Sequence, residues 1–141
     1  MRKDHAANRG LPDEHRNASL LRHIFDAFAR DDLDAIAARF ARDVRWHTPG
    51  RNQLAGDYVG REAVLALVRR SSQLADESYR AEVEDIMTSE RHATALFRAT
   101  GSRGGRQLDL RHLALYAIAD SAVHEVWIAP LDQEAFDAFW A

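Results

Sequence analysis

The sequence lacks cysteine altogether in a chain of 141 residues. Without thiols there is no disulfide framework and no thiolate chemistry. Long apolar runs are missing as well, because those present are much shorter than the roughly 20 residues that a membrane-spanning helix needs. The polar start, Met1-Arg2-Lys3-Asp4-His5, is followed by no apolar segment of the kind found in secretory leaders. We therefore expect a soluble, cytoplasmic protein with no membrane partner.

An excess of positive charge is also absent. The 19 Lys and Arg residues are balanced by 22 Asp and Glu residues, which gives a formal net charge of -3. The arginines are dispersed among acidic residues, so no basic stripe attracts a phosphate backbone, and nucleic acid is not an expected partner. The hydrophobic share of 46% and the charged share of 29% are globular values. We expect a flexible N-terminal arm at residues 1–16 and a single domain at residues 17–141.

Apolar residues recur at three- and four-residue spacing in the first half of the chain, which predicts amphipathic helices. The most regular stripe is Leu20, Leu21, Ile24, Phe25 and Phe28, with Asn17 or Ser19 as the N-cap. Later segments alternate apolar and polar residues instead, which is typical of strands. The predicted helices cover about 17–28, 33–42, 61–71 and 133–140, and the predicted strands cover about 44–48, 79–87, 92–100, 107–118 and 123–129.

Helices followed by an antiparallel meander predict an α+β fold. We expect a cone-shaped, curved antiparallel sheet that wraps around the N-terminal helices, and the cone is the natural place for a pocket. The stretch Val44–Val64 combines a strand, a Pro49-Gly50 break, a glycine-punctuated loop and a new helix. We interpret this stretch as the rim of a small-molecule pocket.

The order of these elements carries several sequence motifs. They are W-H-T-P-G at the end of the first strand, L-A-G-D-Y-V-G-R-E-A-V in the following loop and helix, and H-E-V-W and D-Q-E-A-F-D-A-F-W near the end. Together they resemble the SnoaL-like and ketosteroid isomerase-like group of the nuclear transport factor 2-like superfamily. The resemblance covers residues 17–141 and implies the nuclear transport factor 2-like, or cystatin-like, roll. The group is functionally mixed and contains polyketide cyclases, ketosteroid isomerases, limonene epoxide hydrolases and members with no assigned activity.

The family's functional residues carry over only in part. The ketosteroid isomerases have a general-base aspartate just before a proline, where this chain has His47 and Thr48. The epoxide hydrolases have an aspartate two residues after a tryptophan of the last strand, and here that position after Trp127 is Ala129, which argues against that chemistry. The resemblance to SnoaL cyclases, which use a late-strand aspartate, leaves Glu125 as the nearest acid on the last strand.

His47, His112 and Glu125 are the candidate catalytic residues. A neutral imidazole at position 47 could abstract a proton, and the alternative is a histidine packed beside Pro49. His112 shares a strand face with Tyr116, so it could donate to a carbonyl oxygen, and the alternative is a satisfied core polar group. Glu125 is a buried acid if its strand face points inward, and otherwise belongs to a surface or an interface.

Aromatic residues are the candidate ligand contacts. Tyr58 either closes over a ligand or anchors its own loop, and Trp127 forms an aromatic wall only if its face, shared with Glu125, points inward. Val126 and Ile128 compete for that side. The full set of candidate ligand-binding residues is Trp46, Tyr58, Tyr116, Trp127 and Trp140.

No cofactor or metal is expected. His124-Glu125 lacks the second histidine of a zinc-protease helix, and the Gly101–Gly105 stretch lacks the Lys-Ser/Thr ending of a phosphate loop.

The resulting hypothesis is a homodimer, paired through the outer sheet face, that binds a hydrophobic molecule carrying a carbonyl or hydroxyl group. As an enzyme it would use His47 as base and His112 or Tyr58 to stabilise an enolate, giving isomerisation or an aldol-type cyclisation. The alternatives are a non-catalytic carrier and a dimerisation scaffold with a vestigial pocket.

Overall fold

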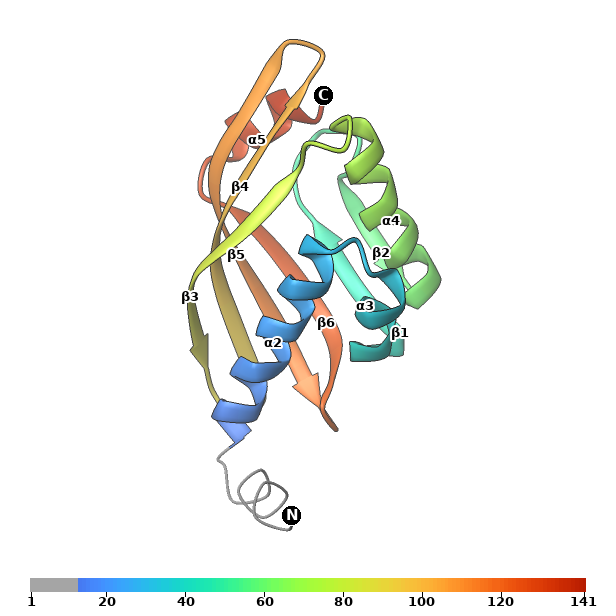
Figure 1. Cartoon of the computed structure of the whole chain (residues 1–141), viewed down its shortest axis with the longest axis vertical. Coiled ribbons are helices and arrows are strands. Elements are labelled where there is room, and N and C mark those ends of the chain that lie inside the picture. The colour runs from blue at the N-terminus through green and yellow to red at the C-terminus, as the bar shows by residue number, and fades with distance from the viewer. Residues whose placement is uncertain (1–12) are drawn as a thin grey trace.

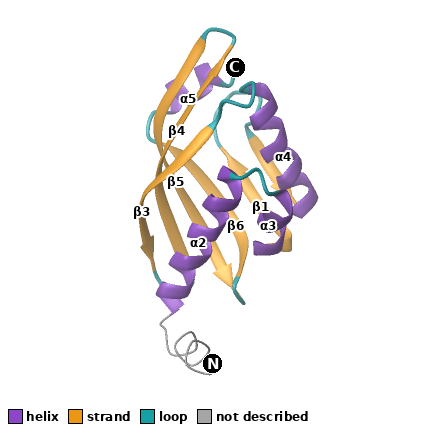
Figure 2. Cartoon of the chain, viewed as in Figure 1, coloured by secondary structure: helices purple, strands orange, loops and turns teal. Residues whose placement is uncertain are grey.

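The computed structural model describes residues 13–141, so the expected arm lies outside the described residues except for its last four positions. Six strands form one sheet in the order β2-β1-β6-β5-β4-β3. Figure 1 shows that the sheet curves around α2, and Figure 2 shows the helices gathered on its concave side. The expected α+β cone is therefore confirmed.

The helix α2 (Asp13–Ala29) lies across the concave face of the sheet. Its buried residues include the predicted stripe Leu20, Leu21, Ile24 and Phe25. The helix begins at Asp13, earlier than expected, and the acidic residues of its first turn suit the positive end of the helix dipole. A polar start can therefore belong to a helix that an apolar period alone does not reveal.

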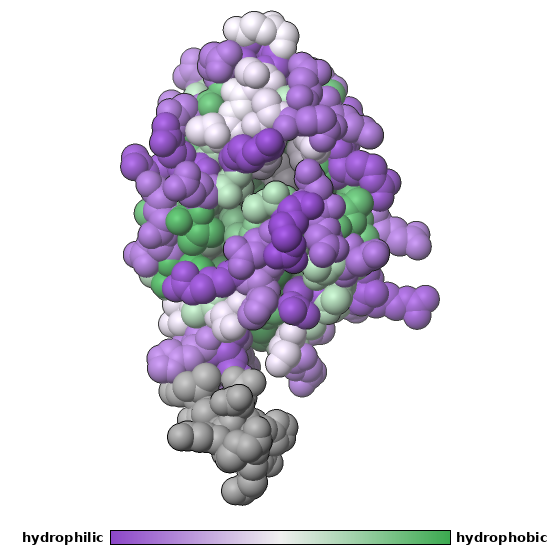
Figure 3. All heavy atoms as spheres, in the orientation of Figure 1, coloured by the Kyte–Doolittle hydropathy of each residue, from purple (hydrophilic) through white to green (hydrophobic). Residues whose placement is uncertain are grey.

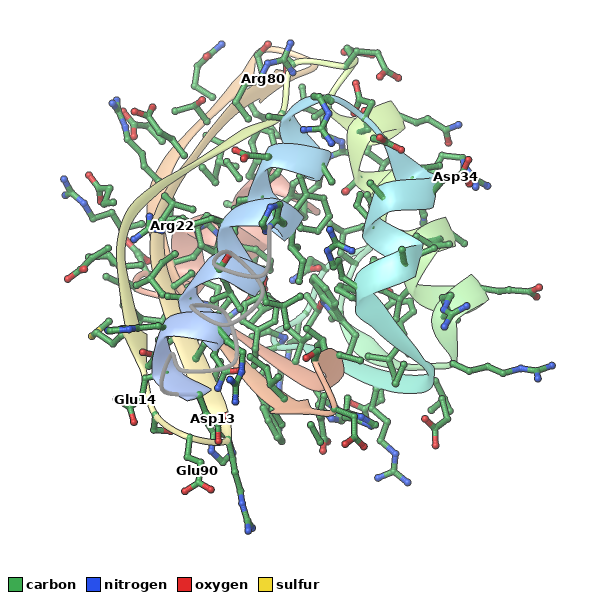
Figure 4. The ribbon with its side chains drawn as sticks, turned by 60° about the horizontal axis from the view of Figure 1, so that its bottom comes forward. Asp13, Glu14, Arg22, Asp34, Arg80 and Glu90 are labelled. Atoms are coloured by element: carbon green, nitrogen blue, oxygen red, sulfur yellow. The ribbon has the colours of Figure 1, made fainter. Side chains whose placement is uncertain are left out.

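Asn17 does not cap this helix, although the sequence suggested it. Its buried side chain donates hydrogen bonds of 2.9 and 3.0 Å to the carbonyl oxygens of Ser89 and Glu90. Figure 4 shows the result, with Asp13, Glu14 and Glu90 gathered at one end of α2. The amide thus fastens the helix to the turn between β3 (Arg80–Thr88) and β4 (His92–Arg103).

The second helix is shorter than its apolar spacing predicted. Helix α3 (Leu33–Arg39) begins after its N-cap Asp32, whose side chain accepts a hydrogen bond from the Ala35 amide. Phe40, expected in this helix, instead opens strand β1 (Phe40–Thr48) and pairs with Val123. The local helical spacing did not decide the conformation of Phe40, because strand pairing buries its ring almost completely.

Strand β1 pairs in parallel with β6 (Ala122–Pro130), so the sheet is mixed rather than fully antiparallel. On its other side β1 pairs with β2 (Gly56–Val59), a short strand inside what the sequence predicted to be loop. Helix α4 (Arg61–Leu74) then returns over β1 on the concave side. The segment Val44–Val64 is therefore an edge of the sheet with a covering helix.

The remaining strands form the expected meander, and β5 (Arg106–Ala119) sits between β4 and β6. The stretch 101–106, left between two predicted strands, is a two-residue turn at Gly104 and Gly105 flanked by strand residues. Both glycines have positive φ, as a tight two-residue β-hairpin turn requires. Helix α5 (Gln133–Phe139) closes one end of the cone with Phe136 and Phe139 buried, followed by the buried Trp140.

None of the described helices is long and apolar enough to cross a membrane.

Candidate ligand-binding cavity

A cavity of about 190 Å³ lies inside the cone. Its walls come from the concave face of the sheet and from α2, α4 and α5, and they are predominantly aromatic and aliphatic. Most exposed among the lining residues are Ala29, Asp31 and Arg80, so the mouth lies between the end of α2, the end of α4 and the start of β3. The aromatic lining residues are Phe25, Phe28, Trp46, Tyr79, Phe97, His112, Tyr116, Phe136 and Trp140.

Arg80 lies at the opposite end of the molecule from Glu90 and the first turn of α2 (Figure 4). One of its guanidinium nitrogens, Nη1, donates to the carbonyl oxygens of Glu77 and Tyr79. The polar lining residues at the mouth are Asp31, Ser71, Ser72 and Arg80. On the face drawn in Figure 3, hydrophilic residues predominate, with paler and hydrophobic ones between them. The entrance is polar, whereas the interior is not.

His112 is the polar centre of the cavity. It lies on β5, is 1% exposed, stacks on Phe97 with ring centroids 4.9 Å apart, and meets Phe136 edge-on at 5.5 Å. Its Nδ1 lies 3.1 Å from the carbonyl oxygen of Leu110. Burial lowers the pKa of His112 from 6.5 to about 4, so the ring is neutral at physiological pH.

The other polar groups of the interior are also neutral. The indole Nε1 of Trp46 donates a 3.1 Å hydrogen bond to the Thr48 hydroxyl, which satisfies a buried donor at the wall. Burial raises the pKa values of Tyr79 and Tyr116, so both phenols keep their protons. Among the described residues, Asp31 at the mouth is the one carboxylate that lines the cavity.

His47 does not face this cavity, contrary to expectation. Its neighbours Trp46 and Thr48 line the cavity, and strand alternation turns His47 to the opposite, outer face. There its Nδ1 lies 2.7 Å from Asp57 and its Nε2 lies 2.6 Å from Glu125. Both ring nitrogens lie at hydrogen-bond distance from carboxylate oxygens. The hydrogen bond with Asp57 has the largest effect and the one with Glu125 the next, and both raise the pKa of His47 above 6.5.

Glu125 and Trp127 also lie on the outer face, the second of the two alternatives that the sequence left open, and neither lines the cavity. Val126 is fully buried and Ile128 lines the cavity, which settles the competition that the sequence left open. Trp127 is 37% exposed and stacks on the imidazole of His47 at 5.7 Å. The three predicted catalytic residues therefore do not meet in one cavity: His112 lines it, whereas His47 and Glu125 contact each other on the outer face.

Tyr58 anchors its own loop, the second of the two alternatives. Its hydroxyl donates a 2.8 Å hydrogen bond to the carbonyl oxygen of Leu54, and it is not among the cavity-lining residues. Only Trp46, Thr48 and Leu54 of the stretch from Val44 to Val64 reach the cavity, all of them buried. The stretch forms part of the wall and not the rim.

Three predicted residues, Trp46, Tyr116 and Trp140, do line the cavity together with His112. Sequence reasoning missed Phe97 as the stacking partner of His112. The sequence contained a signal that Phe97 is buried, because Phe97 shares a strand face with Ala95 and Ala99. The contact between Phe97 and His112 depends on the register of β4 and β5, which the sequence did not reveal.

Residues 13–141 contain no group of three or more histidine, aspartate or glutamate side chains placed to hold a metal ion.

A protein-family comparison matches residues 21–126 to the SnoaL-like domain. The Mycobacterium tuberculosis protein Rv0034 is 32% identical over 123 residues, which cover 86% of this chain and 94% of that protein.

Solved structures share the fold. Bal32a, from a soil-derived mobile gene cassette, superposes with a TM-score of 0.89 at 28% identity, covering 92% of this chain and 99% of that one. A candidate polyketide cyclase of Xanthomonas campestris superposes with a TM-score of 0.71 at 22% identity, covering 92% and 99%. The second likeness bears on fold alone.

Proposed function

This chain belongs to the SnoaL-like domain family, and we propose that it binds a small, mainly apolar molecule inside the cone, with His112 as the polar anchor. The observation that carries the proposal is an open aromatic cavity that holds one buried, neutral imidazole. Such a combination of apolar wall and few polar groups is typical of small-molecule sites.

The volume limits the size of the ligand. An engineered apolar cavity of about 150 Å³ takes up benzene, so about 190 Å³ suits one ring with substituents or a small fused pair. A cavity of this size also argues against a vestigial pocket filled by side chains.

Binding without chemistry is the function that the geometry supports best. A general base works best with a pKa near the operating pH, and burial lowers the pKa of His112 to about 4. The carboxylate at the wall, Asp31, sits at the exposed mouth and not beside the imidazole. These features favour a carrier or sensor of a small molecule.

Calorimetric titration with naphthalene tests the proposal. Ser71 lines the mouth on α4, so Ser71→Phe should obstruct entry and weaken binding at least tenfold. Gln73→Phe, on an exposed position of the same helix, is the matched control and should bind as the wild type does. Failure of the wild type to bind naphthalene, or equal weakening by both variants, would refute the proposal.

A cofactor-free proton-transfer enzyme is the second candidate function. The accessible imidazole of His112 in an apolar cavity favours it, and a candidate polyketide cyclase shares the fold. His112 would take the proton next to a ligand carbonyl and return one to the enolate. Incubation of 2-tetralone with the protein in D2O tests this: deuterium at the α carbon above the His112→Phe background supports catalysis, and none supports carriage.

We also propose that a second copy of the chain covers the outer face of the sheet. The strand register places Trp127, Leu115 and Met87 in one row that crosses β6, β5, β4 and β3, with Thr94 of β4 between Leu115 and Met87. Trp127, Leu115 and Met87 are exposed apolar side chains. Ion pairs of 2.6 and 2.7 Å, Arg111–Glu84 and Arg98–Asp109, lie further along these strands, beyond the neighbouring pair of Leu96 and Leu113. An apolar centre with a charged margin is typical of a self-complementary interface.

A further inference from the structure

The hydrogen bond of His112 to the backbone fixes which ring nitrogen carries the proton. The carbonyl oxygen of Leu110 has lone pairs only, so at 3.1 Å it must accept and Nδ1 must donate. The neutral ring holds a single N–H, and that N–H is used. The other nitrogen, Nε2, is therefore a bare acceptor.

The second nitrogen opens onto the cavity. Among residues 13–141 no hydrogen-bond partner of Nε2 is found, and no polar side-chain atom that is fully buried lacks a partner. An unpartnered Nε2 therefore cannot be fully buried. Because the His112 ring lines the cavity, Nε2 is accessible from the cavity. Phe97 covers one ring face and Phe136 makes an edge contact with the ring, so the ring is held in place while Nε2 stays accessible.

We propose that the ligand is a small, uncharged aromatic alcohol whose hydroxyl donates a hydrogen bond to Nε2 of His112. This inference rests on the proposed binding function and adds the ligand class. The aromatic walls favour a flat ring, and the cavity volume allows one ring or a small fused pair. A ketone or a carboxylate has only acceptor atoms, which would face the lone pair of Nε2 and leave it unsatisfied.

This ligand class differs from the carbonyl compound expected for an imidazole that donates. With Nδ1–H already bound to Leu110, His112 has no proton to offer a carbonyl oxygen. The site therefore favours ligands that donate a hydrogen bond over ligands that only accept one. One satisfied neutral hydrogen bond corresponds to about a tenfold difference in affinity.

Calorimetric titration at pH 7 with 2-naphthol, naphthalene, 2-methoxynaphthalene and 2-acetylnaphthalene tests the inference. Wild-type protein should bind 2-naphthol about tenfold more tightly than the methoxy and acetyl compounds. In His112→Phe this preference should fall to about one, with naphthalene still bound. In the control His124→Phe, the same substitution at an exposed position outside the cavity, the preference should persist.

The possible results separate the two proposals. If naphthalene binds and 2-naphthol has no advantage, or if His112→Phe keeps the advantage, the ligand class is wrong and the binding function stands. If none of the four compounds binds, the binding function itself fails.

A spectroscopic measurement covers the case in which His112→Phe does not fold. In 15N spectra of the wild-type protein, 2-naphthol should shift the Nε2 resonance of His112 in the direction of a hydrogen-bonded nitrogen, and 2-methoxynaphthalene should not. Equal shifts with both compounds would overturn the inference.

Discussion

His47 and His112 lie on opposite faces of the same sheet and have opposite protonation preferences. His47 has a carboxylate on each ring nitrogen, at 2.7 and 2.6 Å, which raises its pKa. His112 lies between aromatic rings and a backbone carbonyl, and burial lowers its pKa. The imidazole with the raised pKa therefore belongs to the outer surface and the neutral one to the cavity, and each can be tested separately.

Stability should fall with acid because of His112. Its pKa is about 4 in the folded state and near 6.5 in the unfolded state, so the unfolded state binds more protons between these values. The contribution is complete above pH 6.5 and lost as the pH falls to 4, and the difference corresponds to about 3 kcal/mol. Urea unfolding at pH 7 and pH 4.5 measures it.

His112→Phe should remove this part of the pH dependence and keep the part that comes from carboxylates. An unchanged loss of stability in the variant would show that other groups cause it.

His47 should titrate above 6.5, with the opposite sign. Its contribution to stability is present below pH 6.5 and lost as the pH rises through the raised pKa. Asp57→Asn and Glu125→Gln should each lower the midpoint in an NMR titration of the ring. A midpoint at or below 6.5 in the wild-type protein would contradict the arrangement.

Asn17→Ala should destabilise the fold by about 1–3 kcal/mol, because it removes two hydrogen bonds that the buried Asn17 amide donates to backbone carbonyl oxygens. Those carbonyls belong to Ser89 and Glu90, so the loss falls on the contact between α2 and the β3–β4 turn. Ser19→Ala, at an exposed position of the same helix, is the control. Chemical unfolding compares the two, and equal stabilities would show that the amide is dispensable.

Trp127→Asp should convert a dimer into a monomer if the outer sheet face is the interface. Trp127 sits in the apolar row with Leu115, where a carboxylate would be buried without a partner. Ala66→Asp, on an exposed position of α4 on the concave side, should leave assembly unchanged. Sedimentation velocity distinguishes the two states, and a monomeric wild-type protein would refute the proposed interface.

The sequence by itself determined the fold class and the order of the elements, with the exception of the short strand β2. Stripes such as Leu20–Phe28 and the alternation of the late strands depend on local geometry, and local geometry is written in neighbouring residues. It also indicated that Glu125 and Trp127 share one strand face and Val126 the other.

Only the tertiary structure decided which face points inward. A period of two defines two faces and does not say which one the helices cover. That choice came from distant contacts: the parallel pairing of β1 with β6, the strand β2 beside them, and the register that stacks Phe97 on His112. These contacts place His47 on the outer surface, away from the expected active site, and leave His112 as the residue on which the proposed function of the cavity depends.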